Sequence, residues 1–126
     1  MTLAPELAGL DFCYLTTTGR VTGKPHRIEI WFAAHPQRDT IFLMAGGRER
    51  SDWIRNLVAT PACTVEIGDR RFAGTARVIE GAEDDEVART TVHDKYATGD
   101  DLQSWRATAL PVAIDLRDAR DERVIS

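Results

Sequence analysis

A hairpin with a strongly basic turn most constrains the fold of this 126-residue chain. Residues 15–31, LTTTGRVTGKPHRIEIW, are two strand-like runs that flank a segment with two glycines. No carboxylate occurs from Phe12 through Ile28, although the whole chain has 20 acidic and 16 basic residues. The cations in this window are Arg20, Lys24, His26 and Arg27. Hydroxyls, glycines and cations on one turn are suited to binding phosphate or carboxylate groups.

An ordinary solvated loop is the competing interpretation of this turn, because hairpin loops often contain glycines and cations. The turn does not match the phosphate-binding loop of nucleotide triphosphatases. Gly19 and the Gly23-Lys24 pair are one residue too close, and Pro25 stands where Ser or Thr would bind magnesium. We therefore expect an anion site of another type, if the turn binds a ligand at all.

A second candidate anion site follows the apolar strand predicted over 40–45. Gly46-Gly47 lead into a predicted helix over 51–58, for which Ser51 is a good N-cap. The helix has one apolar stripe and ends before Pro61; the stripe comprises Trp53, Ile54, Leu57 and Val58. Free N–H groups at a helix N-terminus favour anions, and Arg48 and Arg50 flank this one. Weak pairing of both arginines with nearby carboxylates is the alternative.

The remaining segments predict a mainly β (α+β) fold. Strands are expected over 11–17, 27–32, 62–68, 71–80 and 110–116, and helices over 4–10 and from 83 to about 99. Residues 101–107 are expected to form one more turn, and 117–126 a charged tail. Because short turns join most of the strands, we predict a six-stranded antiparallel split β-barrel with a few flanking helices.

Length and charge narrow the class of protein. The size predicts a single domain, residues 1–126. A net charge of −4 is atypical of nucleic-acid-binding proteins. No run approaches the ~20 apolar residues of a membrane span, and the first ten residues lack the basic start of a secretory signal. We expect a cytoplasmic protein without a metal site, because its three histidines lack metal-ligand spacing.

The order of these motifs resembles the deazaflavin-dependent nitroreductase family, small split-barrel oxidoreductases that use coenzyme F420. The resemblance runs from about residue 15 to 96 and includes LTTTGR-x-TGK-x-x-R, Gly46-Gly47, Asp52-Trp53-x-x-Asn56-Leu57 and the TVEIGDR hairpin. It implies that the basic turn binds the phosphate and acidic tail, that the Gly-Gly turn lies along the deazaflavin ring, and that Trp31, Met44 and Trp53 cover the ring. The implied cofactor-binding residues are Arg20, Thr22, Gly23, Lys24, Arg27, Met44, Ala45, Gly46, Gly47, Arg48, Trp53 and Asn56.

The resemblance also implies a reaction, in which reduced F420 passes a hydride to a small enone, quinone or nitro compound. Tyr96 and Ser51 are the candidate catalytic residues, as possible proton donors at the pocket edge. Two alternatives stay open: an oxidoreductase of the same barrel that uses FMN, as the pyridoxamine-phosphate-oxidase-like proteins do, and a non-catalytic binder of F420, a lipid or a tetrapyrrole. A homodimer is expected by analogy with other split barrels.

Overall fold

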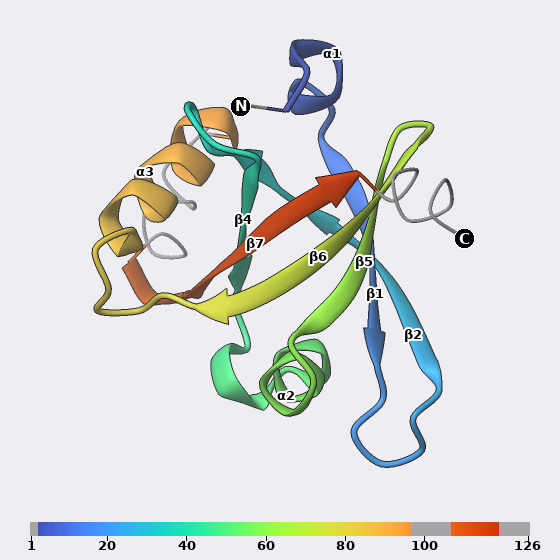
Figure 1. Cartoon of the computed structure of the whole chain (residues 1–126). Coiled ribbons are helices and arrows are strands. Elements are labelled where there is room, and N and C mark those ends of the chain that lie inside the picture. Colours follow the sequence, from blue (N-terminus) through green and yellow to red (C-terminus); the bar gives the residue numbers. More distant parts are fainter. Residues whose placement is uncertain (1–2, 97–106, 119–126) are drawn as a thin grey trace.

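The computed structural model describes residues 3–96 and 107–118, and its strands form one curled antiparallel sheet (Figure 1). The order across the sheet is β2-β1-β5-β6-β7-β4-β3. The strands are β1 (Phe12–Thr18), β2 (Pro25–Trp31), β3 (Ala33–Ala34), β4 (Thr40–Ala45), β5 (Ala62–Ile67), β6 (Arg70–Val78) and β7 (Leu110–Asp118). Short connections join most strands that are consecutive in the chain, as the sequence predicted, and every pairing is antiparallel.

The chain itself closes the sheet into a split barrel. Strands β2 and β3 lie at the two ends of the strand order, yet only Phe32 separates them. After this fully buried residue the chain leaves β1, and Ala33 and Ala34 pair with β4. The predicted antiparallel split barrel is thereby confirmed. The predicted number of strands was wrong, because a two-residue strand carries no alternation that sequence reasoning can detect.

Within residues 3–96, four helical segments flank the sheet: α1 (Pro5–Ala8), the 3-10 helix η1 (Arg48–Arg50), α2 (Asp52–Ala59) and α3 (Asp85–Tyr96). Helix α3 lies on one side of the sheet, over β4 and β7, whereas α2 lies below it near the lower ends of β1 and β6 (Figure 1). Among the described residues, no helix has the length and apolar character that a membrane crossing requires.

Two apolar cores meet at β4, whose six residues are all buried. Ile41, Leu43 and Ala45 point into the barrel core, whereas Phe42 and Met44 point into a second core under α3. The strand is therefore covered on both faces, as its continuous apolar run predicted. This packing fixes β4 and the Gly-Gly turn that follows it.

Several predicted boundaries and faces were wrong. Strand β6 ends at Val78 and not at Glu80, α3 begins at Asp85 and not at 83, and β7 extends to Asp118. Val58, which was predicted on the apolar stripe of the helix over 51–58, is 67% exposed. The predicted end of the late helix near 99, the turn over 101–107 up to residue 106 and the tail beyond 118 lie outside the described residues.

Candidate functional site

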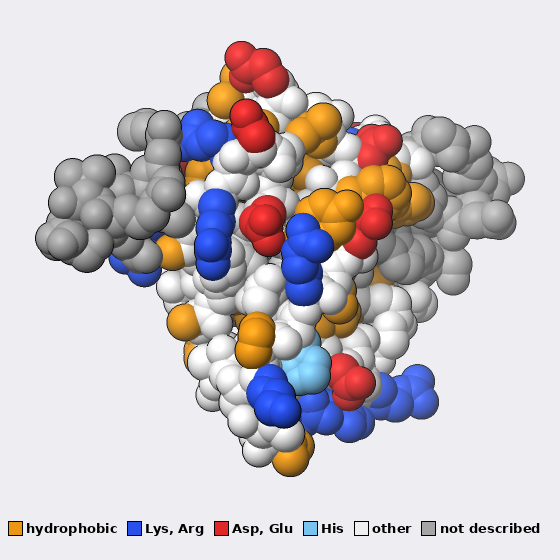
Figure 2. All heavy atoms as spheres, turned by 90° about the vertical axis from the view of Figure 1, so that its right-hand side faces the viewer, with side chains coloured by type: hydrophobic (Ala, Val, Ile, Leu, Met, Phe, Trp, Pro, Cys, Tyr) orange, Lys and Arg blue, Asp and Glu red, His pale blue; other side chains and the backbone are white. Residues whose placement is uncertain are grey.

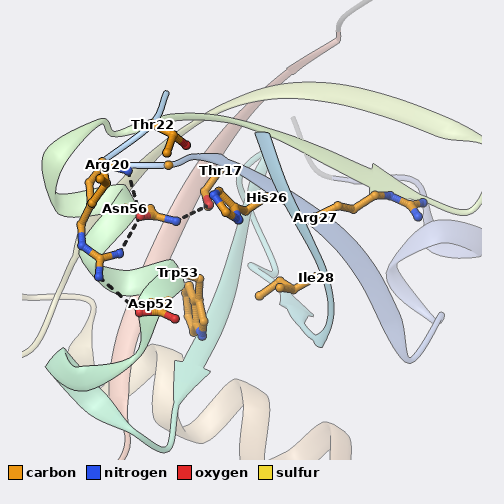
Figure 3. Close-up of a pocket in the computed structure, with 11 residues that line it drawn as sticks. Thr17, Arg20, Thr22, His26, Arg27, Ile28, Asp52, Trp53 and Asn56 are labelled. Carbon is orange, nitrogen blue, oxygen red and sulfur yellow. Dashed lines mark hydrogen bonds and ion pairs between the residues drawn. The ribbon is translucent and has the colours of Figure 1, made fainter. Parts of the chain in front are cut away.

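A cavity of about 440 Å³ opens between the β1–β2 hairpin and helix α2 (Figure 3). Its lining combines cations, hydroxyls and a flat apolar side. The lining residues are Thr17, Gly19, Arg20, Val21, Thr22, His26, Arg27, Ile28, Asp52, Trp53 and Asn56. The volume lies within the range of about 300–1,000 Å³ that is usual for small-molecule sites.

The basic turn is a compact loop of six residues between Thr18 and Pro25, which pair at the ends of β1 and β2. The N–H of Gly19 donates to the carbonyl of Lys24 at 2.8 Å, and the N–H of Gly23 donates back to the carbonyl of Gly19 at 2.8 Å. Gly23 has a φ of 75°, a left-handed conformation that glycine adopts without strain. The turn is therefore ordered by its own backbone before any ligand binds.

Asn56 joins this turn to α2. Its side-chain oxygen accepts hydrogen bonds from the backbone N–H of Arg20 at 3.2 Å and from Nη1 of Arg20 at 2.9 Å. Its amide nitrogen donates to the hydroxyl of Thr17 at 3.1 Å. Asn56 is only 4% exposed, so these bonds form away from water. The sequence predicted Asn56 as a cofactor contact, and the structure shows it holding Arg20 in place.

The cations of the hairpin point in different directions (Figure 3). The guanidinium of Arg20 stays at the cavity, where Nη2 is 3.3 Å from a carboxylate oxygen of Asp52. Arg27 extends away from it, with Nε 3.3 Å from Glu66 and its guanidinium 4.0 Å from the ring centroid of Tyr14. His26, by contrast, points between Thr17 and Trp53. The cavity is thus cationic through Arg20 and, when protonated, through His26.

The surface around the β1–β2 hairpin is also rich in cations. Figure 2 views the molecule from the β2 side, and Lys and Arg side chains gather at its lower end, where the β1–β2 hairpin lies. Over the upper and middle part of that face, further Lys and Arg side chains lie among acidic and apolar ones. The cations at the hairpin thus lie beside the cavity in an overall acidic chain, which favours an anionic ligand there.

The Gly-Gly turn and Arg48 form a separate cluster. Arg48 has a φ of 52° and does not line the cavity. Its guanidinium donates to both carboxylate oxygens of Glu80 at 2.5 and 2.6 Å and to the carbonyl of Thr108 at 2.6 Å. The carboxylate of Glu80 raises the pKa of Arg48. These bonds tie η1 to the end of β6 and to the chain before β7, so a ligand would have to compete with them for Arg48.

The structure brings together only part of the predicted set. Of the residues predicted for the cofactor, Arg20, Thr22, Arg27, Trp53 and Asn56 line the cavity, and Gly23 and Lys24 belong to the same turn. Met44 and Ala45 are buried in the two cores, and the exposed Gly46 and Gly47 lie outside the lining. Trp31, expected to cover a ring, stacks instead on Tyr96 with ring centroids 4.6 Å apart.

Neither candidate catalytic residue lines the cavity. The hydroxyl of Tyr96 contacts the carbonyls of Phe32 and Asp11 at 2.5 and 2.6 Å and accepts from the N–H of Phe32 at 3.2 Å. Burial raises the pKa of Tyr96 to about 12. Ser51 is the N-cap residue of α2, but its side chain makes no capping hydrogen bond. These contacts suit Tyr96 to packing more than to proton donation.

The predicted cofactor-binding set omitted His26, Ile28 and Asp52, although His26 had been named among the cations of the turn. A signal for two of them was present, because strand alternation places His26 and Ile28 on one face of β2. Asp52 lies four residues before Asn56, so both share one side of α2. The arrangement can hold an anion at Arg20 and a flat apolar group against Trp53 and Ile28.

Comparisons with known proteins give the family of this chain and structures that share its fold. The model of a family described as F420H(2)-dependent quinone reductase matches residues 2–117. A solved F420-H2 dependent reductase (FDR-A) is 23% identical over 85% of this chain and 94% of its own, with a TM-score of 0.67. HutZ, the heme storage protein from Vibrio cholerae, is 16% identical over 94% of this chain and 92% of its own, with a TM-score of 0.70. A third structure, described as a domain-swapped dimer, is 24% identical over 85% of this chain and 80% of its own, with a TM-score of 0.66. At these identities the three structures establish the fold alone.

Proposed function

The chain belongs to the F420H(2)-dependent quinone reductase family and is an F420-dependent reductase, and on that premise we propose that the hairpin cavity holds the coenzyme for reduction of a small quinone. The observation that carries the assignment of the cavity is the guanidinium of Arg20, which Asn56 holds at its edge. An arginine fixed in advance loses little side-chain entropy when it binds a phosphate or carboxylate.

The residues of the cavity fit the coenzyme in chemistry. F420 carries a phosphate and an acidic tail, which require cations, and a flat ring, which requires apolar cover. Arg20 and Thr22 supply a charge and a hydroxyl at the turn, and Lys24 adds a second cation to the same loop. Trp53 and Ile28 supply the apolar cover. When bound, reduced F420 supplies a hydride.

In this proposal the protein positions the coenzyme and the substrate and excludes water from them. Trp53 and Ile28 hold the reactants together and restrict access of solvent. Reduction of a quinone to a hydroquinone by a hydride also consumes one proton. We assign that proton to solvent, because the hydroxyl of Tyr96 is engaged with backbone carbonyls. Enones and nitro compounds accept a hydride by similar chemistry and are the other substrate classes of this proposal.

A fluorescence titration with oxidised F420, run beside FMN, tests the assignment of the cavity. We expect saturable, salt-sensitive binding of F420 and none of FMN. Arg20→Ala should weaken binding by roughly tenfold or more, because a hydrogen bond to a charged group contributes about 1.5–3 kcal/mol. Arg71→Ala is the matched control, since it removes the same charge from an exposed position outside the cavity.

Equal affinities of Arg20→Ala and Arg71→Ala would overturn the assignment of the cavity. Binding of FMN alone would move the chain to the flavin-dependent branch of the fold. Loss of F420H2 absorbance on addition of a soluble quinone, and not of an enone or nitro compound, would establish the substrate class. Binding of F420 without turnover of any of the three would favour a storage or carrier role.

Asp52 is expected to compete with the coenzyme for Arg20. Its carboxylate is 83% exposed and lies 3.3 Å from the guanidinium, so an incoming anion must displace it. Asp52→Asn should therefore tighten F420 binding by about two- to fivefold, in line with the small energies of exposed ion pairs. Asp69→Asn, at the exposed β5–β6 turn, is the control for net charge. Weaker binding by Asp52→Asn would show instead that Asp52 helps to position Arg20.

The homodimer and the cytoplasmic location predicted from the sequence stay predictions. The description of one relative as a domain-swapped dimer supports the first of them.

A further inference from the structure

The side chain of His26 lines the cavity, but the proposed function above gives it no role. It lies opposite Thr17 in the pairing of β1 with β2, and both residues line the cavity. In Figure 3 its imidazole points between Thr17 and Trp53, at the centre of the labelled residues. Among the residues that the structure describes, none hydrogen-bonds to this ring. The two ring nitrogens are thus available to a ligand in the cavity.

The turn is shaped to admit this imidazole. A Cβ atom placed on Gly19 would lie 2.6 Å from Nε2 of His26 and 2.8 Å from its Cδ2, closer than side chains approach. Only glycine at this position lets the ring lie across the start of the turn. The resulting contact brings the imidazole beside the same loop that carries Arg20, so both side chains serve one end of the cavity.

The charged groups at the end of the cavity that carries Arg20 and His26 determine how protonation of His26 would change the local charge. Arg20 and Lys24 come from the turn, Arg27 is the next residue on β2, and Asp52 comes from α2. Three of these four are cations, and the side chain of Arg27 is directed to Glu66. The strand β1 contributes only the uncharged Thr17 to this side. A protonated imidazole therefore adds positive charge where Arg20 is partly offset by Asp52.

We propose that His26 is a further binding residue for the anionic part of the coenzyme and that its protonation tightens binding. The inference rests on the proposed function, because it takes the cavity as the F420 site. An imidazole normally changes charge between about pH 5 and pH 8. The imidazolium can donate two hydrogen bonds to phosphate or carboxylate oxygens, whereas the neutral ring can donate only one. Binding should accordingly strengthen as the pH falls through that range and be accompanied by proton uptake.

The test compares dissociation constants of oxidised F420 at about pH 5.5 and about pH 8.5, at constant ionic strength, for the wild type, His26→Gln and His26→Lys. For each protein, the dissociation constant at the higher pH is divided by that at the lower pH. We expect this ratio to be about three- to tenfold larger for the wild type than for His26→Gln. His26→Gln should bind weakly at both values, and His26→Lys tightly at both. Titration of the coenzyme itself affects all three proteins equally, so the ratios between proteins are the readout.

A further variant tests whether the position of the imidazole, and not only its presence, causes the pH dependence. Gly19→Ala keeps His26 but displaces the ring, and we expect it to lose the pH dependence as His26→Gln does. The same pH dependence in His26→Gln as in the wild type would overturn this inference and leave the proposed function intact. Failure of all three proteins to bind F420 at either pH would instead overturn the assignment of the cavity.

Discussion

Asn56→Leu is expected to lower the free energy of unfolding by about 2–3 kcal/mol, because it leaves buried polar groups without the hydrogen-bond partner that Asn56 provides. The leucine side chain has the same number of heavy atoms and the same branching but cannot accept from the backbone N–H and guanidinium of Arg20, nor donate to Thr17. Chemical denaturation, followed by tryptophan fluorescence, measures the change. The same variant should weaken F420 binding, since Arg20 loses its support.

Two comparisons make this result specific. Arg55→Leu introduces the same side chain at the next, exposed position of α2, and we expect a change within about 0.5 kcal/mol. Thr17→Val removes only the hydrogen bond from Asn56 to Thr17 and should lower the free energy of unfolding by about 1 kcal/mol. It can therefore test the contribution of Asn56 if Asn56→Leu does not fold. A stable Asn56→Leu protein with normal affinity would show that Arg20 needs no support from α2.

The hairpin and its turn were predictable because their signals are local. Alternation and turn residues identified β1 and β2, and the cation-only window identified the loop that borders the cavity. The same alternation, extended back from Ile28, places the side chain of His26 on the same face of β2 as Ile28. The sequence placed His26 among the cations of the turn, but the set of cofactor-binding residues implied by the family resemblance did not include it.

Other features depend on partners that are distant in the sequence. Arg48 follows a Gly-Gly turn, which made it a plausible ligand contact, but Glu80 lies 32 residues later and binds its guanidinium. Trp31 was expected to cover the coenzyme ring, but it stacks on Tyr96 of α3. No local pattern reveals which of several arginines or aromatic residues a distant element will cover. Tertiary packing decides this, and it decides which side chains remain for a ligand.

The hydroxyl of Tyr96 marks one such distant contact. It lies against backbone groups of Phe32, where the chain bends from β2 to β3, and of Asp11, where it enters β1. The neighbouring Lys95 donates from Nζ to the carbonyls of Ala8, Leu10 and Phe32 at 3.0, 2.5 and 2.9 Å. The end of α3 therefore holds together the two chain segments that close the barrel.

Tyr96→Phe is expected to lower the free energy of unfolding by about 2 kcal/mol, because the buried N–H of Phe32 and the carbonyl of Asp11 lose their partner. Tyr14→Phe is the matched control, since it deletes the same atom from a ring that is 37% exposed, and its effect should stay within about 0.5 kcal/mol. Thermal and urea denaturation report the difference. Quinone reduction per folded molecule should be unchanged in Tyr96→Phe if the hydroxyl only packs. A stable variant that binds F420 normally but reduces quinone many times more slowly would establish Tyr96 as the proton donor.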